Sequence, residues 1–166
     1  MAKKYDFCGW ATRNDVLCAD GRRIRQGAFS KQNGNRVPLI WNHEHDDVNM
    51  VLGHAILEDR KDGVYAYGYF NNTENGKAAK ETVRHGDVAS LSIWANHLTQ
   101  DGGDVLHGTI REVSLVLAGA NPEARIDTYI SHSGFNPDGD EAEIYTAGAF
   151  SLEFMHSDDS QPEPEE

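Results

Sequence analysis

Short apolar runs alternate with turn-forming residues along most of the chain, and this pattern predicts a protein built mainly from β-strands. The clearest example is residues 64–69, where tyrosines occupy every second position and smaller residues fill the others. Only a strand places two such sets on opposite faces, because its side chains alternate with a period of two. Six to seven strands are expected, within residues 5–12, 37–41, 51–57, 64–70, 88–97, 109–118 and 126–131.

One segment has helical rather than strand periodicity. Between residues 73 and 85, Ala78, Ala79 and Val83 recur at helical spacing, and Gly86 is placed to end the helix in the left-handed conformation. These elements predict an α+β, mainly β fold with one or a few helices. We expect a single-domain antiparallel β-barrel or curled sheet, since closing or curling a sheet protects the edges of its strands.

The 166-residue chain is long enough for one compact domain of ordinary size. We expect this domain to span residues 1–132, followed by a turn-rich linker and a C-terminal strand or partner-contacting segment over residues 133–156. Residues 157–166 carry five acids, two prolines and no apolar side chain, so burial cannot offset the entropy of ordering them. A disordered acidic tail is expected there.

Charge and cysteine content narrow the functional class. The net charge is −12 at neutral pH, but nearly all of the excess lies beyond residue 125, where no Lys or Arg occurs. A nearly neutral body without a basic stripe is a poor nucleic-acid binder, because clustered Lys and Arg supply most of the affinity for phosphate. Two cysteines, Cys8 and Cys18, form no disulfide framework, and neither a signal peptide nor a membrane-spanning apolar run is found. We expect an intracellular protein that binds neither nucleic acid nor membrane.

Three clusters of polar residues could carry chemistry. The first, residues 42–47, follows an apolar run and contains His43, His45 and Asp47 in an H-x-H-x-D pattern. Imidazole and carboxylate groups at this spacing are typical metal ligands, although the related element of metallo-β-lactamase-like hydrolases needs a further histidine where this chain has Val48. A metal site and a polar loop after a buried strand both fit these residues.

The other two clusters lie in predicted strands. Ser92 lies on the strand face opposite Leu91 and Ile93, and Glu112 lies opposite the apolar row of its own strand. A carboxylate in such a strand is costly to bury unless it is paired, so a surface salt bridge between Glu112 and Arg111 is one interpretation. Together with a histidine, the serine and the carboxylate could instead form a nucleophile, its base and the group that orients the base.

A series of short elements extends in order along residues 5–125. It consists of Gly9-Trp10-Ala11, Gly27-Ala28-Phe29, Leu39-Ile40-Trp41-Asn42-His43-Glu44, Leu52-Gly53, Arg84-His85-Gly86-Asp87-Val88-Ala89-Ser90-Leu91-Ser92-Ile93, Arg111-Glu112-Val113-Ser114-Leu115-Val116 and Ala120-Asn121-Pro122. No single element is specific, but the ordered set resembles that of the procapsid (prohead) maturation serine proteases of tailed bacteriophages. This family is distantly similar to the herpesvirus assemblins.

The resemblance implies that Ser92 is the catalytic nucleophile and that His43 is its general base. It implies Glu112 as the third member of the triad. Assemblins have a second histidine in that role, for which His107 is the nearby candidate in this chain. Neither a cofactor nor a metal ion is expected for this chemistry.

The resemblance also implies a function and a setting. The protein would be a serine endopeptidase that cleaves the scaffold or the N-terminal delta region of the major capsid protein, and also itself. It would act as an oligomer inside the assembling procapsid, in the cytoplasm of the bacterial host. Residues 1–132 would then form the protease domain, residues 133–156 could contact the scaffold, and self-cleavage could remove the acidic tail.

Two residues leave alternatives open. Trp94 stands two residues after Ser92, where many relatives have glycine, so a catalytically inactive capsid-assembly or scaffold-associated protein of the same fold is one alternative. His45 would point away from His43 if the segment were extended, and we expect it to be a surface or supporting group. A metal-dependent hydrolase that uses His43, His45 and Asp47 is the other alternative.

Overall fold

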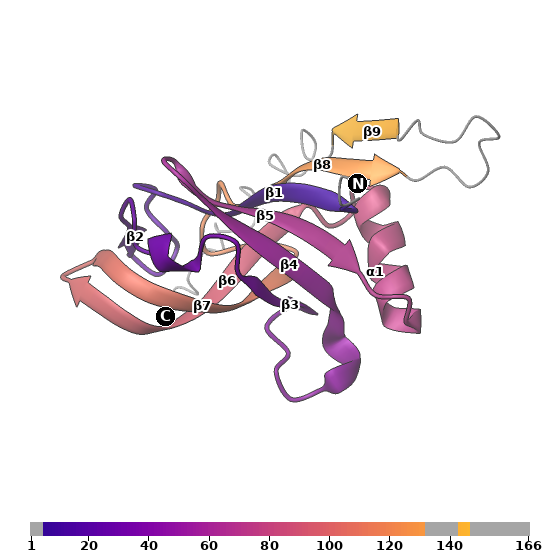
Figure 1. Cartoon of the computed structure of the whole chain (residues 1–166), viewed down its shortest axis with the longest axis horizontal. Helices are drawn as coiled ribbons and strands as arrows, with labels where there is room; N and C mark the ends of the chain where they lie inside the picture. The colour runs from indigo at the N-terminus through magenta and orange to yellow at the C-terminus, as the bar shows by residue number, and fades with distance from the viewer. Residues whose placement is uncertain (1–4, 132–142, 147–166) are drawn as a thin grey trace, which may run out of the picture.

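Each of the predicted apolar runs forms a β-strand in a computed structural model, which describes residues 5–131 and 143–146 (Figure 1). The predicted helix is present as well. The short strand β2 and two 3-10 helices add to the predicted elements, and the short strand β9 lies within the segment predicted to hold a C-terminal strand. The elements are β1 (Phe7–Arg13), β2 (Arg23–Ile24), η1 (Ser30–Gln32), β3 (Arg36–Trp41), η2 (Val48–Met50), β4 (Val51–Arg60), β5 (Gly63–Phe70), α1 (Glu74–Arg84), β6 (Ser90–Asp101), β7 (Asp104–Val116), β8 (Ile126–Ser131) and β9 (Glu143–Thr146).

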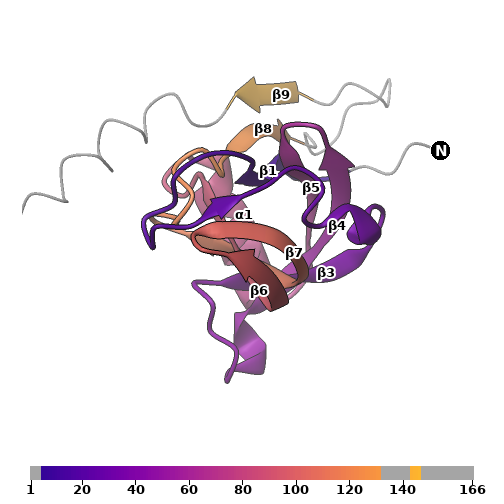
Figure 2. The same ribbon diagram turned by 90° about the vertical axis from the view of Figure 1, so that its left-hand side faces the viewer.

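The strands form one mixed sheet in the order β2-β7-β3-β4-β5-β1-β8-β9, and β6 pairs with β7 beside this path. Most neighbours are antiparallel, but β2 and β3 each run parallel to β7. The expectation of an antiparallel sheet is wrong for these two pairs, because an apolar run indicates that a strand is buried and not in which direction its partner runs. Strand pairing among the described residues does not close the sheet into a barrel. The sheet curls instead, as the second view shows (Figure 2).

One apolar cluster fills the inside of the curled sheet. Leu39 of β3, Leu91 of β6, and Val113 and Leu115 of β7 are each at most 1% exposed. Burying one such side chain stabilises the fold by about 1.5–3 kcal/mol. The three strands that carry the candidate chemistry are therefore fixed to one another through the same core.

The single described α-helix, α1, packs against β4, β5 and β8. Thr73 caps its N-terminus, since the Thr73 Oγ1 accepts a hydrogen bond of 3.1 Å from the Gly76 N–H. Gly86, with φ of 80°, follows its C-terminus in the left-handed conformation that the sequence predicts. Val83 is fully buried and joins the helix to the core. No helix in the described part of the chain is long and apolar enough to cross a membrane.

The predicted C-terminal organisation lies only partly within the described residues. β9 falls inside the segment predicted as a linker and C-terminal strand, and it pairs antiparallel with β8. The remainder of that segment, residues 133–142 and 147–156, and the predicted acidic tail at residues 157–166 lie outside the described residues. The predicted boundaries between these segments stay predictions.

The long hairpin of β6 and β7 sets the candidate residues opposite one another. Ser92 pairs with Ser114, and Trp94 pairs with Glu112. On the other side of β7 lies β3, whose last residue, Trp41, pairs with the residue just after Ser114. The chain that leaves β3 therefore arrives at the open end of the hairpin, where β6 begins and β7 ends, and it carries His43 and His45 with it.

Gly9 provides a test of how tightly the sheet is packed. A Cβ at this position in β1 would overlap the backbone of Arg125 and Ile126 at the start of β8. We expect Gly9→Ala to lower the free energy of unfolding by about 1–3 kcal/mol, because the two strands must separate to make room. Urea denaturation followed by circular dichroism measures this change.

Gly86→Asn is the matched control for that variant. A Cβ at Gly86 has open space around it, and asparagine tolerates the left-handed conformation. We expect its cost to stay below about 1 kcal/mol. Equal unfolding free energies for Gly9→Ala and the wild type would show that β1 and β8 are not in close backbone contact.

Candidate active site

The turn that follows β3 determines where the two histidines point. Asn42 and His43 both adopt the left-handed conformation, with φ of 48° and 55°. This conformation is uncommon for residues other than glycine and often occurs at functional sites. Three hydrogen bonds hold the turn: Asn42 N–H to the Leu115 carbonyl at 2.9 Å, His43 N–H to Ser114 Oγ at 3.0 Å, and Glu44 N–H to the Trp41 carbonyl at 3.0 Å.

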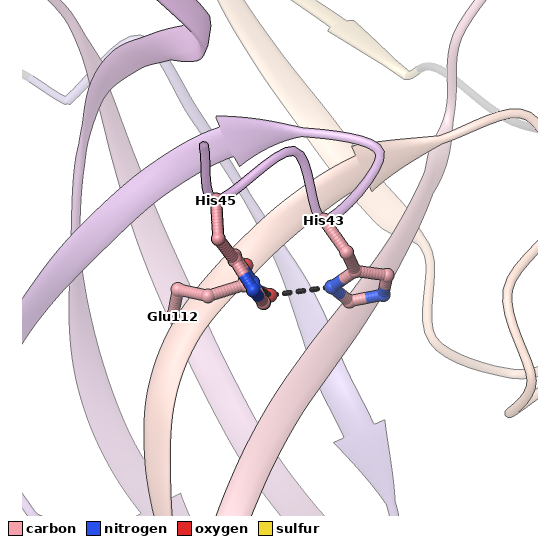
Figure 3. A group of neighbouring side chains, drawn as sticks. All are labelled: His43, His45 and Glu112. Atoms are coloured by element: carbon pink, nitrogen blue, oxygen red, sulfur yellow. Dashed lines mark hydrogen bonds and ion pairs between the residues drawn. The ribbon is translucent and has the colours of Figure 1, made fainter. Parts of the chain in front are cut away.

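The His43 imidazole bridges a hydroxyl group and a carboxylate. Its Nδ1 forms a short contact with Glu112 Oε1 (Figure 3). Its Nε2 lies 2.9 Å from Ser92 Oγ. Because an ionised carboxylate only accepts hydrogen bonds, the ring proton is assigned to Nδ1, and Nε2 is left to accept from the Ser92 hydroxyl. A hydroxyl, an imidazole and a carboxylate in this order have the geometry that a nucleophile, its base and the group orienting the base require.

Glu112 is a buried carboxylate with several donors around it. Only 3% of its surface is exposed. One oxygen, Oε1, faces His43 and also lies 3.3 Å from His45 Nε2. The other, Oε2, accepts a hydrogen bond of 2.8 Å from Ser114 Oγ. A surface salt bridge with Arg111 is therefore not the role of Glu112, since these inward-facing donors compensate for the cost of burying its charge.

His45 points to the same side as His43, and the expectation that it points away is wrong (Figure 3). The prediction assumed an extended segment, whereas the left-handed turn removes the alternation of side chains. The His45 ring also packs against the ring of Trp94, with centroids 4.4 Å apart and an angle of 35° between the planes. Trp94 thus supports His45 instead of intruding between Ser92 and His43.

Two further predicted candidates lie apart from this group. His107 is exposed on β7, opposite Thr99 and five residues before Glu112, which corresponds to about 16 Å along a strand. Asp47 is also exposed, and its carboxylate caps η2 by accepting a hydrogen bond of 2.9 Å from the Asn49 N–H. In the described part of the chain, the side chains that could share a metal ion are those of His43, His45 and Glu112, and not the predicted set with Asp47.

A cavity of about 200 Å³ opens beside Ser92. Its lining includes an ion pair of 3.1 Å between Arg22 and Asp20, next to the buried Cys18. Burial and the nearby Asp20 carboxylate raise the pKa of the Cys18 thiol, so this sulfur is a weak nucleophile. The apolar part of the lining includes Ile24, Phe29, Ile93, Trp94, Leu98 and Val105.

Sequence reasoning missed Ser114, which holds two parts of the site together. The Ser114 hydroxyl donates to Glu112 and accepts from the His43 backbone, so it connects β7 to the turn that carries the histidine. The sequence holds one signal for it, because Ser114 has the same strand parity as Glu112, opposite to the apolar row. Only the structure shows that Ser114 is fully buried there.

Comparison with known families adds an observation independent of this geometry. Residues 9–137 match the model of the caudovirus prohead serine protease family. The chain belongs to this family. The matched range includes all the residues described above as candidates, and it confirms the family that the ordered elements predict. The family is one of serine proteases, in agreement with the predicted class.

Comparison with solved structures found a KSHV protease in complex with a hexapeptide phosphonate inhibitor, with a TM-score of 0.47 and 12% sequence identity. The match covers 72% of this chain and 62% of the KSHV protease chain, so this chain spans less than two thirds of that protein. Comparison with curated protein sequences found no significant match.

Ser114→Ala tests the buried hydrogen bonds of the site. The substitution leaves Glu112 Oε2 and the His43 N–H without their partner in the folded protein. We expect the free energy of unfolding to fall by about 1–3 kcal/mol, because buried polar groups without partners are costly. Chemical denaturation gives this value.

Ser92→Ala is the matched control on the neighbouring strand. Ser92 is half-buried and contacts one ring nitrogen, so we expect a change below about 1 kcal/mol. If the two alanine variants unfolded with the same free energy, the role assigned to Ser114 would be wrong.

Proposed function

We propose that this protein is the serine endopeptidase of procapsid maturation, with Ser92 as nucleophile, His43 as general base and acid, and Glu112 as the residue that orients His43. The observation that carries the proposal is the His43 ring between the Ser92 hydroxyl and the buried Glu112 carboxylate. Membership of the prohead serine protease family supports the same assignment.

The proposed reaction begins with attack on a peptide bond. Ser92 Oγ forms a bond to the scissile carbonyl carbon while His43 Nε2 takes the hydroxyl proton, and the carbonyl oxygen becomes negatively charged. The intermediate then breaks its C–N bond, and the His43 imidazolium gives the proton to the leaving amine. Water repeats these steps to release Ser92 from the acyl-enzyme. Proton transfer by a positioned histidine contributes typically 10²–10⁴-fold to such rates.

Glu112 would act on the base and not on the substrate. Its carboxylate keeps the His43 proton on Nδ1 before the reaction and stabilises the imidazolium afterwards. Burial makes this interaction stronger, because fewer water molecules screen the two charges. We therefore assign Glu112, and not His107, as the third member of the triad.

We also propose how the substrate binds. In the described residues β6 has one strand partner, β7, and the start of its other edge is bonded to the segment before β8, where the Leu91 N–H donates to the Ala124 carbonyl. We propose that an extended peptide pairs with the part of this edge that begins at Ile93, just after Ser92. A peptide added there would direct one of its side chains into the cavity next to Ser92. The lining, which includes Ile93, Ala95 and Leu98, favours an apolar side chain of moderate size.

The proposed substrates and partners follow from the family's link to the prohead. They are the scaffold or N-terminal delta region of the major capsid protein, and further copies of this protease, inside the procapsid that assembles in the host cytoplasm. The acidic tail would contact the scaffold or be removed by self-cleavage. We assign no role in nucleic-acid or membrane binding to this protein.

Two alternatives predict different behaviour. A catalytically inactive assembly protein would not cut the capsid precursor at all, whatever the state of Ser92. A metal-dependent hydrolase would lose activity in the presence of a chelator and would be indifferent to Ser92→Ala. The packing of Trp94 on His45 gives no support to the inactive form, because it leaves the contact between Ser92 and His43 intact.

Substitution of the three proposed catalytic residues tests the mechanism. With the capsid precursor as substrate, we expect Ser92→Ala to lower kcat by about 10⁶-fold. Glu112→Gln should lower kcat by about 10³–10⁴-fold, because an amide stabilises the wrong tautomer and leaves the imidazolium unpaired. Gel-based cleavage kinetics, with thermal unfolding to verify that each variant is folded, measures both effects.

His107→Gln is the control for these variants. His107 lies outside the proposed site, so we expect kcat within about twofold of the wild type. A strong loss with His107→Gln and a mild one with Glu112→Gln would reverse our assignment of the third residue.

Self-cleavage is tested by the intact mass of the protein. We expect purified wild-type protein to lose mass from its acidic C-terminus over time, and we expect Ser92→Ala protein to keep its full mass. Intact-protein mass spectrometry under conditions where the wild type cuts the capsid precursor makes the comparison. Equal masses for the two proteins would rule out self-removal of the tail and leave scaffold contact as its role.

A further inference from the structure

We propose that His43, His45 and Glu112 form a zinc site whose occupation switches the protease off. The inference rests on the proposed function, since it requires His43 to act as the base. It assigns a regulatory role to His45, which has none in the reaction itself. The proposed ligand atoms are His43 Nδ1, His45 Nε2 and Glu112 Oε1.

The positions of the three groups come close to what zinc requires, with one adjustment. His43 Nδ1 and Glu112 Oε1 share a short hydrogen bond, so they must move apart to about 3.3 Å when zinc replaces the proton between them. One ligand atom from each residue can be chosen so that all lie within 4.8 Å of one another. His45 Nε2 and Glu112 Oε1 are 3.3 Å apart, close to the spacing of about 3.3 Å between ligands of a tetrahedral zinc ion. Both histidine rings face Glu112 (Figure 3). Two imidazoles and one carboxylate with an open fourth position form a recurrent zinc ligand set.

The surroundings allow an ion to enter and would hold the ligands in place. The side chains of His43 and His45 are 34% and 39% exposed, so the site can be reached from solvent. Ser114 holds Glu112 through Oε2, so the carboxylate stays in place when zinc replaces the Nδ1 proton that Oε1 now accepts. Trp94 packs against His45 and restricts the orientation of its ring. Groups that orient metal ligands in this way commonly raise metal affinity by 10–100-fold.

Zinc at this position would inhibit the protease because it changes which nitrogen of the His43 ring carries the proton. A neutral imidazole carries one proton, and a nitrogen that binds metal must give its lone pair to the metal. If Nδ1 of His43 binds zinc, the proton moves through solvent from Nδ1 to Nε2, with no net gain or loss. Nε2 then donates to Ser92 Oγ and can no longer accept the hydroxyl proton. Glu112 and zinc thus enforce opposite tautomers of the same ring.

Other histidines in the described part of the chain do not share this arrangement of ligands. His85 also lies near a carboxylate, with its Nε2 3.8 Å from Glu81 Oε2, but among the described residues it belongs to no group of three side chains that could share a metal ion. His107 is not part of any group of metal-binding side chains in the described region. These two residues provide matched controls for a zinc-binding experiment.

Direct binding is measured on the full-length Ser92→Ala protein, which would not cut itself. We expect isothermal titration calorimetry with zinc chloride to show that one zinc ion binds per chain. When His45→Gln is added to this protein, we expect the affinity for zinc to fall at least about tenfold. His85→Gln and His107→Gln should leave the affinity unchanged. No zinc binding, or a loss of binding caused by the control substitutions and not by His45→Gln, would overturn the proposal.

Nitrogen NMR of His43 tests the mechanism of inhibition. Long-range correlation of the ring nitrogens should show the proton on Nδ1 in the zinc-free protein and on Nε2 after zinc is added. An unchanged tautomer would show that zinc acts elsewhere.

Activity measurements separate this proposal from the proposed function. We expect zinc to inhibit cleavage of the capsid precursor by wild-type protein, and a chelator to restore it. For each protein, inhibition is expressed relative to its own rate without zinc. The His45→Gln protein should need at least about tenfold more zinc than the wild type for the same fractional inhibition. A protein that binds zinc as expected but never cleaves the precursor would refute the proposed function and leave the site in place. Activity that is lost with the chelator would refute the inhibitory role.

Discussion

The buried carboxylate of Glu112 is the constraint on which the rest of the site depends. A charge with 3% exposure is tolerated only where donors surround it, and this carboxylate has two imidazoles on one oxygen and the Ser114 hydroxyl on the other. These contacts fix the position of the turn after β3 and the orientation of the His43 ring. The same burial that costs stability therefore holds the ring with its Nε2 at the Ser92 hydroxyl, as the proposed mechanism requires.

The fold supplies this arrangement through two kinds of strand pairing. The β6–β7 hairpin puts Ser92 next to Ser114 by antiparallel register, and the parallel β3–β7 pair brings the turn with His43 to the same level. Leu39, Leu91 and Val113 bind the three strands together from the core side. His43, Ser92 and Glu112 are thus far apart in the chain but close in space, because β3, β6 and β7 pack on one core and pair at fixed positions.

Much of the fold could be predicted from the sequence, because alternation and turn residues are local signals. The tyrosine pattern at residues 64–69 and the helix ending at Gly86 are examples in which local preference and final structure agree. The parallel pairing of β3 with β7 could not be predicted, since it depends on contacts between distant segments. The direction of His45 was missed for a related reason: two non-glycine residues in the left-handed conformation give no clear signal in sequence.

The candidate site was likewise predictable in some parts and not in others. His43, Ser92 and Glu112 are predicted from the ordered family elements, and the structure brings their side chains together, whereas His107 and Asp47 lie elsewhere. The link between Trp94 and His45 was beyond prediction, because it depends on the register of β6 and on an irregular turn. Trp94, which looked like a departure from the family, thus has a structural role in this chain.

Labelling with a fluorophosphonate probe tests the central claim most directly, because the probe reacts with a serine only when a neighbouring base activates it. Peptide mass spectrometry of the labelled full-length protein would identify the modified residue. Our account predicts a label on Ser92, lost in His43→Ala and retained in His107→Ala. Modification of a different serine, or equal labelling of Ser92 with and without His43, would contradict it.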